Sequence, residues 1–257
     1  MYRLIIGDNN LIMSGLIYKN IKYDIIYLDP PYGMHKINDV IYKDNLNEKN
    51  WEQFMRTRLK KTKNLLKKDG ILFISINDVN FFTLLRLCEN IFKNYNIKKL
   101  KWKKFLYTKR KIPYVNPDYE FVLVVSKNEL KLIENINDDL TFSYDKSLIH
   151  KLGISKYFSY PKPSELFFNL IKFYFNKKTL KILDAFAGSG SSIFGFEQAK
   201  INGLIENYEI DFIQKNEIMK NKYKNSIDTL KNTLDIFEKE FKNETGYFSK
   251  EFRRIYK

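Results

Sequence analysis

Residues 180–192 have the sequence LKILDAFAGSGSS, in which a short apolar strand leads into a glycine-rich turn and then a predicted helix. Glycines in such a turn let the backbone approach a ligand closely, and the N-terminus of the following helix offers free N–H groups. The pattern also fits a tight turn without a ligand. The third phosphate-binding glycine of a dinucleotide site and the Lys-Ser/Thr pair of a triphosphate site are missing, which favours a nucleoside ligand.

Apolar runs alternate with helix-length segments on both sides of this turn. Strands are predicted near residues 4–6, 23–28, 71–76, 97–107, 119–125, 180–183 and 203–210. Helices are predicted over 48–68, 79–94, 164–176, from the glycine turn to about 199, and within 212–243. This alternation predicts an α/β fold with a mostly parallel sheet, in one domain spanning 1–257. Residues 127–160 have weak periodicity, and we expect a small insertion there.

A second motif, Asp29-Pro30-Pro31-Tyr32, follows the apolar run at 23–28. Each proline restricts the residue before it, so the segment leaves the strand as a stiff, extended hook. The Asp29 carboxylate and the Pro30 carbonyl are two hydrogen-bond acceptors, and Tyr32 supplies a flat face beside them. This set suits an exocyclic amine on a planar ring, such as a nucleobase. The alternative interpretation is a rigid strand terminator.

Positive charge is concentrated in two parts of the 257-residue chain, whose formal net charge is +15. Residues 54–68 contain seven Lys and Arg and no acid, and residues 93–117 contain nine and no acid. Clustered positive charge indicates a polyanionic partner, although solvated faces of a lysine-rich protein give the same composition. In 54–68 the basic residues fall between core-spaced apolar ones, so we favour a solvated helix face. In 98–112 basic and aromatic residues are mixed, which favours phosphate contacts over a lysine-guarded edge strand.

The composition excludes several other classes of protein. One cysteine, Cys88, rules out a disulfide framework, and two histidines leave no metal-binding histidine cluster. We expect Cys88 in the core and no catalytic role for His35. The N-terminus lacks the pattern of a signal peptide and no apolar run could span a bilayer, so we expect an intracellular, cytoplasmic protein without membrane contact.

Together the two motifs resemble the S-adenosylmethionine-dependent amino-methyltransferases of DNA. The hook precedes the glycine turn, as in the permuted β class. Segments 7–9, 119–127 and 161–163 resemble further motifs of this family. Segments 42–51, 58–59, 65–66 and 70–78 resemble the modification subunits of type III restriction systems. Type III subunits are longer and carry a large target-recognition domain where this chain has only 127–160, which we expect to be a reduced recognition region.

The resemblance implies a Rossmann-like methyltransferase fold with a mostly parallel seven-stranded sheet, one antiparallel strand and helices on both faces. It implies catalytic roles for Asp29, Pro30, Pro31 and Tyr32. It implies S-adenosylmethionine binding by Asp8, Asn9, Asp29, Lys162, Asp184, Phe186, Ala187, Gly188, Gly190, Ser191 and an acidic ribose contact, for which Glu209 is preferred to Glu206. The candidates for nucleic-acid binding are Lys101, Lys103, Lys104, Lys109, Arg110 and Lys111.

The expected reaction is methylation of the adenine N6 amine in DNA, because an aspartate begins the hook, whereas serine there usually accompanies cytosine N4 in this family. A base in a duplex must be flipped out to reach such a pocket, and loop 33–46 could close over it. Three alternatives stay open: cytosine-N4 methylation, RNA methylation, or a DNA-binding partner subunit of another methyltransferase. A homodimer, or a heteromeric partner that supplies sequence recognition, is also compatible with the short chain.

Overall fold

The computed structural model describes residues 1–32, 48–107, 113–130, 139–143, 152, 154, 161–175, 178–217 and 225–241. One sheet contains the strands β1 (Tyr2–Ile6), β2 (Tyr23–Leu28), β3 (Leu66–Asn77), β4 (Asn96–Tyr107), β5 (Pro113–Ser126), β6 (Asp139–Ser143), β7 (Thr179–Asp184) and β8 (Asn207–Gln214). The helices are α1 (Asn9–Tyr18), α2 (Glu48–Leu65), α3 (Phe81–Ile91), α5 (Ser164–Tyr174), α6 (Ser192–Ile201) and α7 (Ser226–Phe241). No helix within the described ranges is long and apolar enough to cross a bilayer.

The strands follow the order β1-β8-β7-β2-β3-β5-β4-β6. Only β5 runs against its neighbours, β3 and β4, and all other pairs are parallel. The expected fold, a mostly parallel sheet with one antiparallel strand, is therefore confirmed. The eighth strand, β6, is an addition that lies within 127–160 and pairs with β4. This pairing covers residues 101–105 of β4, so the alternative of a lysine-guarded edge is wrong for that part of the strand.

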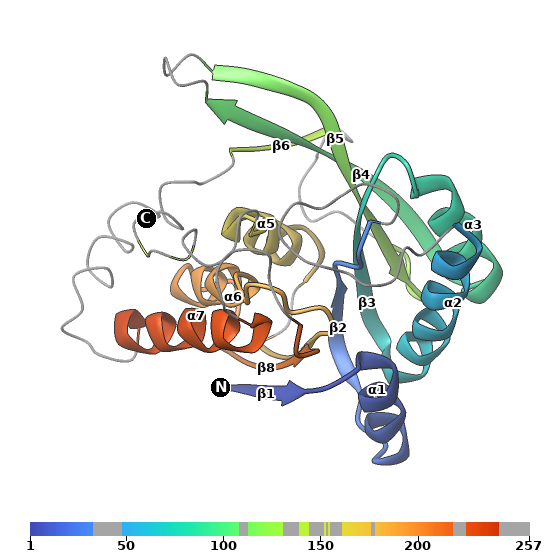
Figure 1. Ribbon diagram of the computed structural model, residues 1–257, viewed down its shortest axis with the longest axis horizontal. Helices are drawn as coiled ribbons and strands as arrows, with labels where there is room; N and C mark the ends of the chain where they lie inside the picture. The colour runs from blue at the N-terminus through green and yellow to red at the C-terminus, as the bar shows by residue number, and fades with distance from the viewer. Residues whose placement is uncertain are drawn as a thin grey trace.

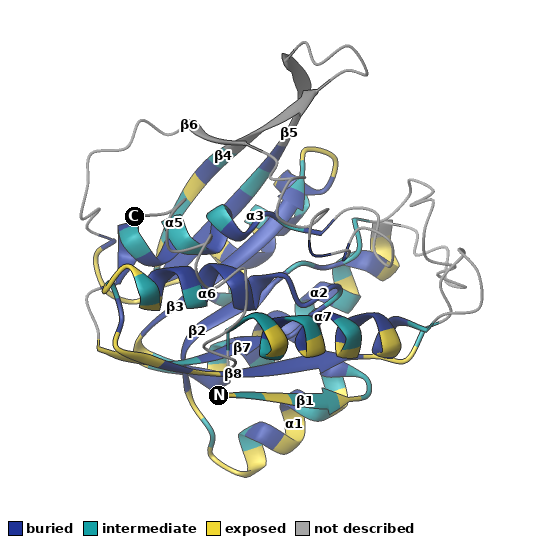
Figure 2. Ribbon diagram, turned by 90° about the vertical axis from the view of Figure 1, so that its left-hand side faces the viewer, coloured by how far each residue is buried: buried dark blue, intermediate teal, exposed yellow. Residues whose placement is uncertain are grey.

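Helices cover both faces of the sheet, with α1, α2 and α3 on one side and α5, α6 and α7 on the other (Figure 1). Strand β2 shows why its sequence is apolar throughout. Ile25 and Tyr27 belong to the core under α5, α6 and α7, whereas Ile26 and Leu28 belong to the core under α1, α2 and α3. A strand buried on both faces has a continuous apolar run instead of an alternating pattern. In Figure 2, which is viewed from the side of α5, α6 and α7, most of the central strands are coloured as buried.

Strands β2 and β7 are neighbours, and this pairing brings the two sequence motifs together. Tyr27 lies opposite Asp184 in the register, and the Ala185 amide donates to the Tyr27 carbonyl at 3.1 Å. The hook after β2 and the glycine turn after β7 thus leave the sheet side by side. Parallel sheets bind ligands outside these carboxyl ends of their strands.

The hairpin formed by β4 and β5 extends beyond the same edge of the sheet (Figure 1). Asn77, the last residue of β3, lies opposite Glu120, and Glu120 lies opposite Trp102. Strand β4 runs parallel to β3, so its residues 103–107 continue past the point where β3 ends. The distal part of the hairpin therefore projects on the side of the hook and the glycine turn.

Candidate active site

Two buried side chains hold the backbone of the hook after Pro30. The Trp51 indole N–H of α2 donates to the Pro31 carbonyl at 2.6 Å, and the Asn80 amide donates to the Tyr32 carbonyl at 2.5 Å. Within the described residues, no hydrogen bond engages the Pro30 carbonyl. The two later carbonyls are thus fixed by the protein, whereas the carbonyl predicted to accept from a substrate amine is left for that purpose.

The Asp29 carboxylate contacts two donors through one of its oxygens. The Tyr32 hydroxyl donates to Oδ1 at 3.0 Å, and Lys162 Nζ lies 3.3 Å from the same oxygen. Burial raises the pKa of Asp29, while Lys162 opposes this rise and the nearby Glu120 adds to it. The ammonium group of Lys162 therefore stabilises the ionised form of Asp29 against the effect of burial.

Lys162, expected to bind cofactor, has its ammonium group at the hook. Its Nζ lies 2.5 Å from the Tyr32 hydroxyl and 2.7 Å from Glu120 Oε2, and 5.0 Å from the centre of the Tyr32 ring. Burial alone would lower the pKa of Lys162, but Asp29 and Glu120 outweigh burial and raise it. Glu120, a buried carboxylate on β5, was not among the predicted site residues.

The glycine turn has the backbone geometry that its sequence predicts. Gly188 and Gly190 have φ values of +54° and +72°, in the left-handed region that favours glycine. The Gly188 amide donates to Gln214 Oε1 at 2.8 Å, which ties the turn to the end of β8. The ring of Phe186 packs with its centre 6.1 Å from that of Phe54.

Asp184 lies at the start of this turn as a buried carboxylate with an unused acceptor. Ser192 Oγ donates to Oδ2 at 2.7 Å, whereas the buried Oδ1 has no hydrogen bond of good geometry among the described residues, although the nearby Phe186 amide lowers the pKa of this carboxyl. Burial raises the pKa of Asp184 to about 7, and nearby Asp29 adds to this rise. A buried acceptor beside two glycines with positive φ fits the expected binding of a nucleoside cofactor here, because such an acceptor calls for a hydrogen-bond donor.

Asp8 and Asn9 also lie at this edge, at the start of α1. Asp8 caps the helix by accepting from the Asn10 amide at 2.7 Å, and the Asn9 side chain donates to the Ala185 carbonyl at 2.8 Å. Arg58, a buried residue that sequence analysis missed, donates to Asn9 Oδ1 at 2.7 Å and lies 3.5 Å from Asp8. Burial lowers the pKa of Arg58 to about 10, against the effect of Asp8. Arg58 thus belongs to the support of this site and not to a solvated face.

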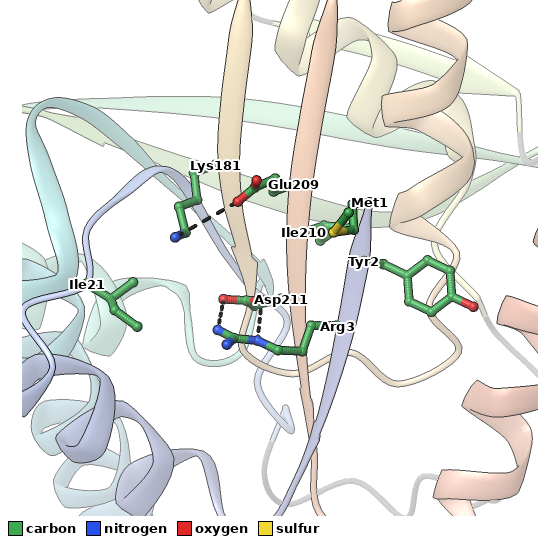
Figure 3. A pocket seen from close by; sticks show the side chains of 8 residues that line it. All are labelled: Met1, Tyr2, Arg3, Ile21, Lys181, Glu209, Ile210 and Asp211. Carbon is green, nitrogen blue, oxygen red and sulfur yellow. Dashed lines mark hydrogen bonds and ion pairs between the residues drawn. The ribbon is translucent and has the colours of Figure 1, made fainter.

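The predicted ribose contact at Glu209 is wrong in position. Glu209 lies in the first half of β8, where it is paired with Lys181 at 4.0 Å, and Glu206 is paired with Lys178 at 2.9 Å before the strand begins. Figure 3 shows Glu209 beside a pocket lined also by Arg3, Lys181 and Asp211. Gln214, the end of β8, lies five positions after Glu209, or about 16 Å along the strand. Glu209 is therefore far from the glycine turn.

Glu217 is the acidic residue that does lie beyond the carboxyl end of β8. Its amide donates to Ser226 Oγ at 3.0 Å, which fixes the backbone there. Burial raises the pKa of its carboxyl, Lys215 opposes the rise and Asp8 adds to it, so Glu217 lies within electrostatic range of Asp8. The signal that could have found it is the apolar pair Phe212-Ile213, which extends the strand past Asp211.

The candidate nucleic-acid residues fall on the β4–β5 hairpin as far as they are described. Lys101, Lys103 and Lys104 belong to β4, and the last two lie beyond the edge where β3 ends. Lys109, Arg110, Lys111 and loop 33–46, with His35, lie outside the described residues. In the other basic segment, Lys61 and Lys63 donate to backbone carbonyls and Arg56 pairs with Glu52, so these residues are engaged within the protein and the segment is not simply the predicted solvated face.

Comparison with known proteins places this geometry in a family. The family model described as "DNA methylase" matches residues 23–202. The "Probable type III restriction-modification enzyme HindVI Mod subunit" of Haemophilus influenzae is 34% identical over 144 residues, which cover 51% of this chain and 18% of that protein. The "Type II methyltransferase M.KpnI" of Klebsiella pneumoniae is 33% identical over 155 residues, which cover 55% of this chain and 36% of that protein. The chain thus matches well under half the length of these curated relatives.

Two solved structures share the fold. The crystal structure of the M1.HpyAVI–SAM complex has a TM-score of 0.61 at 20% identity and covers 91% of this chain and 100% of its own. The PvuII cytosine-N4-specific DNA methyltransferase has a TM-score of 0.61 at 17% identity, and the match covers 92% of this chain and 93% of that chain. Since the family model spans most of the sheet and both motifs, the chain belongs to the N6/N4 DNA methylase family, whose cofactor is S-adenosylmethionine.

Proposed function

We propose that this protein transfers a methyl group from S-adenosylmethionine to the N6 amine of adenine in DNA, with the target base flipped out of the duplex. The observation that carries the proposal is the Asp29 carboxylate beside Tyr32, at the end of a strand whose neighbour ends in the glycine turn. This arrangement puts the acceptors for a base amine next to the expected cofactor site. It also explains why a chain with few histidines and cysteines can be an enzyme.

In this proposal the hook acts by positioning the amine. The bound cofactor supplies an electrophilic methyl group on a positively charged sulfur. Asp29 and the Pro30 carbonyl accept hydrogen bonds from the N6 amine, so that its lone pair points away from them and towards the methyl carbon. Methyl transfer would form a new N–C bond as the C–S bond breaks with its electrons left on sulfur, and the amine would then lose one proton to solvent. Positioning and electrostatics supply the rate acceleration.

The residues that would hold the cofactor lie at the carboxyl ends of β1, β7 and β8. They are Asp8, Asn9, Asp184, Gly188, Gly190 and Glu217. Glu217 replaces Glu209 as the proposed ribose contact. Arg58 supports this set through Asn9 and Asp8.

The test of the proposed function is methyl transfer from labelled S-adenosylmethionine to mixed-sequence duplex DNA, followed by mapping of the modified bases. N6-methyladenine at a short recurring sequence is the expected product. N4-methylcytosine would replace the proposed substrate, and transfer to single-stranded RNA in preference to duplex DNA would replace the proposed polymer. Absence of cofactor binding by calorimetry would instead point to a DNA-binding partner subunit.

The ribose assignment is tested with a pair of equivalent substitutions. Glu217→Gln should weaken cofactor binding about tenfold, because it removes a charged acceptor, whereas Glu209→Gln should leave the affinity unchanged. Isothermal titration calorimetry measures both. Equal affinities of the wild type and Glu217→Gln would exclude Glu217, and a loss confined to Glu209→Gln would restore the original assignment.

The hairpin is the proposed phosphate-binding element, because its distal part projects on the side of the hook. Flipping a base costs a few kcal/mol, which phosphate contacts can offset. The double substitution Lys103→Glu/Lys104→Glu should reduce affinity for duplex DNA and lower the salt dependence of binding by about two phosphate contacts. Fluorescence anisotropy at several salt concentrations measures both effects.

Lys93→Glu supplies the control for this experiment. Lys93 is exposed and belongs to the same basic segment, but it precedes β4 at the opposite edge of the sheet. A loss of affinity per charge equal to that of Lys103→Glu/Lys104→Glu would show that net charge, and not the hairpin, determines binding.

We further propose that 127–160 is a reduced recognition region in a single catalytic domain, and that a second copy or a partner protein supplies the remaining recognition surface.

A further inference from the structure

We propose that Lys162 and Glu120 are a positioning pair that turns Asp29 and Tyr32 towards the target base, so that Lys162 serves the catalytic hook and not the cofactor. This inference rests on the proposed function for its substrate. It assigns a role to Glu120, on β5, and changes the role expected for Lys162. The reason lies in the atoms that the ammonium group contacts.

Three oxygen atoms from two distant parts of the chain surround Lys162 Nζ. They belong to the Tyr32 hydroxyl at 2.5 Å, to Glu120 at 2.7 Å and to Asp29 at 3.3 Å. Prolines on both sides of Lys162 restrict its backbone, and α5 begins two residues later. An ammonium group held in this way is a fixed charge at the hook, with its side chain only 11% exposed.

The contacts to Asp29 distinguish its two oxygens. Tyr32 and Lys162 both approach Oδ1, and no hydrogen bond or ion pair within the described part of the chain engages Oδ2. A carboxylate held through one oxygen presents the other in a fixed direction. Oδ2 is therefore the atom that would accept from the target amine, and Lys162 determines where it points.

Tyr32 is oriented by the same ammonium group. Its hydroxyl donates to Asp29 and accepts from Lys162, so both hydrogen-bonding functions of the phenol are used at one end of the ring. Such a pair of bonds fixes the ring plane, and a base that stacks on Tyr32 meets a preformed face. Preorganised groups lose less entropy when the substrate arrives.

The charges of Lys162 and Glu120 have opposite effects on the pKa of Asp29. Asp29 and Glu120 are two carboxylates close to one cation, and without Lys162 they would repel each other in a largely buried place. Lys162 lowers the pKa of Asp29 and Glu120 raises it, so removing one partner or the other should move the Asp29 titration in opposite directions. Tyr32 of the hook, Tyr27 of β2 and Asp184 of β7 are the other titratable groups within electrostatic range of Asp29.

The experiment compares Lys162→Met, Lys162→Arg, Glu120→Gln and the double variant Lys162→Met/Glu120→Gln. For Lys162→Met we expect kcat to fall about 100-fold, with the KM for DNA and the Kd for S-adenosylmethionine within about threefold of the wild type. The acid limb of the kcat profile should move to higher pH in Lys162→Met and to lower pH in Glu120→Gln. Lys162→Arg should be faster than Lys162→Met but slower than the wild type. Arginine keeps the positive charge, but its planar guanidinium cannot take the place of the compact ammonium group.

Lys178→Met and Glu206→Gln are matched controls. This exposed Lys–Glu pair is joined at 2.9 Å, close to the distance of the Lys162–Glu120 pair, and lies at the opposite edge of the sheet. Both control variants should have the wild-type rate and pH profile. If Lys162→Met does not fold, the test is made with Glu120→Gln and with the double variant Lys162→Met/Glu120→Gln, which removes one charge of each sign and so keeps the net charge.

A measurement without substrate separates this inference from the proposed function. Carbon-13 NMR of labelled aspartate carboxyls reports the titration of Asp29 directly, and Asp29→Asn identifies its signal. Opposite pKa shifts in Lys162→Met and Glu120→Gln would support the pair even if DNA is not the substrate. Unchanged titration in both variants, or cofactor affinity reduced more than about 30-fold in Lys162→Met with an unchanged pH profile, would overturn it.

Discussion

Replacing Asp29 by asparagine will lower kcat for methyl transfer at least about 1000-fold, while cofactor binding stays measurable by calorimetry. The reason lies in the donors around Oδ1. Tyr32 and Lys162 both donate there, so the single oxygen of the substituted amide must take that position. The NH₂ group of the amide then occupies the position of Oδ2 and faces the amine of the base. Two donors cannot bond each other, and the amine loses its acceptor and the nearby negative charge.

Asp78→Asn is the control for this substitution. Asp78 follows β3 at the same edge of the sheet, is exposed, and caps the Val79 amide at 2.9 Å. Its variant should keep kcat within about threefold, since surface substitutions change little. Methyl transfer by Asp29→Asn within about tenfold of the wild type, in single-turnover assays, would contradict the assigned role of the carboxylate.

Replacing Gly190 by alanine will destabilise the fold by about 3 kcal/mol and weaken cofactor binding. Two effects add. The backbone has φ +72°, which L-residues rarely adopt, and a Cβ there would overlap Cδ1 of Leu230. Leu230 is completely buried in α7, so relief of the overlap requires its side chain to change rotamer within the packed core, or the glycine turn or the helix to move. Urea unfolding and calorimetry with S-adenosylmethionine measure the two losses.

Gly203→Ala separates strain from overlap. Gly203 has nearly the same φ, +71°, but nothing lies within 4 Å of its hypothetical Cβ. This variant should lose only the strain energy, about 1 kcal/mol, and keep its cofactor affinity. Equal losses of stability in the two variants would show that the contact between the turn and α7 has no effect.

The elements that sequence alone predicted well are those in which local pattern and burial agree. The run 23–28 is apolar because β2 is covered on both faces, and the two motifs mark where β2 and β7 end. The rule for parallel sheets places both motifs at the same edge of the sheet, and the structure shows that β2 and β7 are direct neighbours. Strand β6 could not be predicted, because its pairing with β4 depends on a neighbour that is distant in the sequence and not on its own composition.

The site predictions also depend on where the strands end. The strand predicted near 203–210 is β8, Asn207–Gln214, so the segment beyond its carboxyl end begins four residues later than predicted and contains Glu217, the ribose contact proposed in place of Glu209. Strand ends are hard to locate from single sequences, because burial and not local propensity decides where pairing stops. Sequence alone also does not show which side chains Lys162 and Arg58 contact. No local pattern reveals that a lysine faces Glu120 or that an arginine reaches Asn9.

The strand order has a consequence for how the protein comes to fold. The amino group of Met1 donates to Tyr208, 207 residues later, and the Asn9 side chain reaches Ala185, 176 residues later. At roughly 5–20 residues per second, a ribosome needs about 10–40 s to make the partner of the first strand. Contacts between such distant residues also form slowly after synthesis, because the chain loses entropy on closing the loop before the contacts can stabilise it. A nascent chain therefore carries a complete hook long before it can hold a cofactor, and competence for catalysis arrives with the last strand.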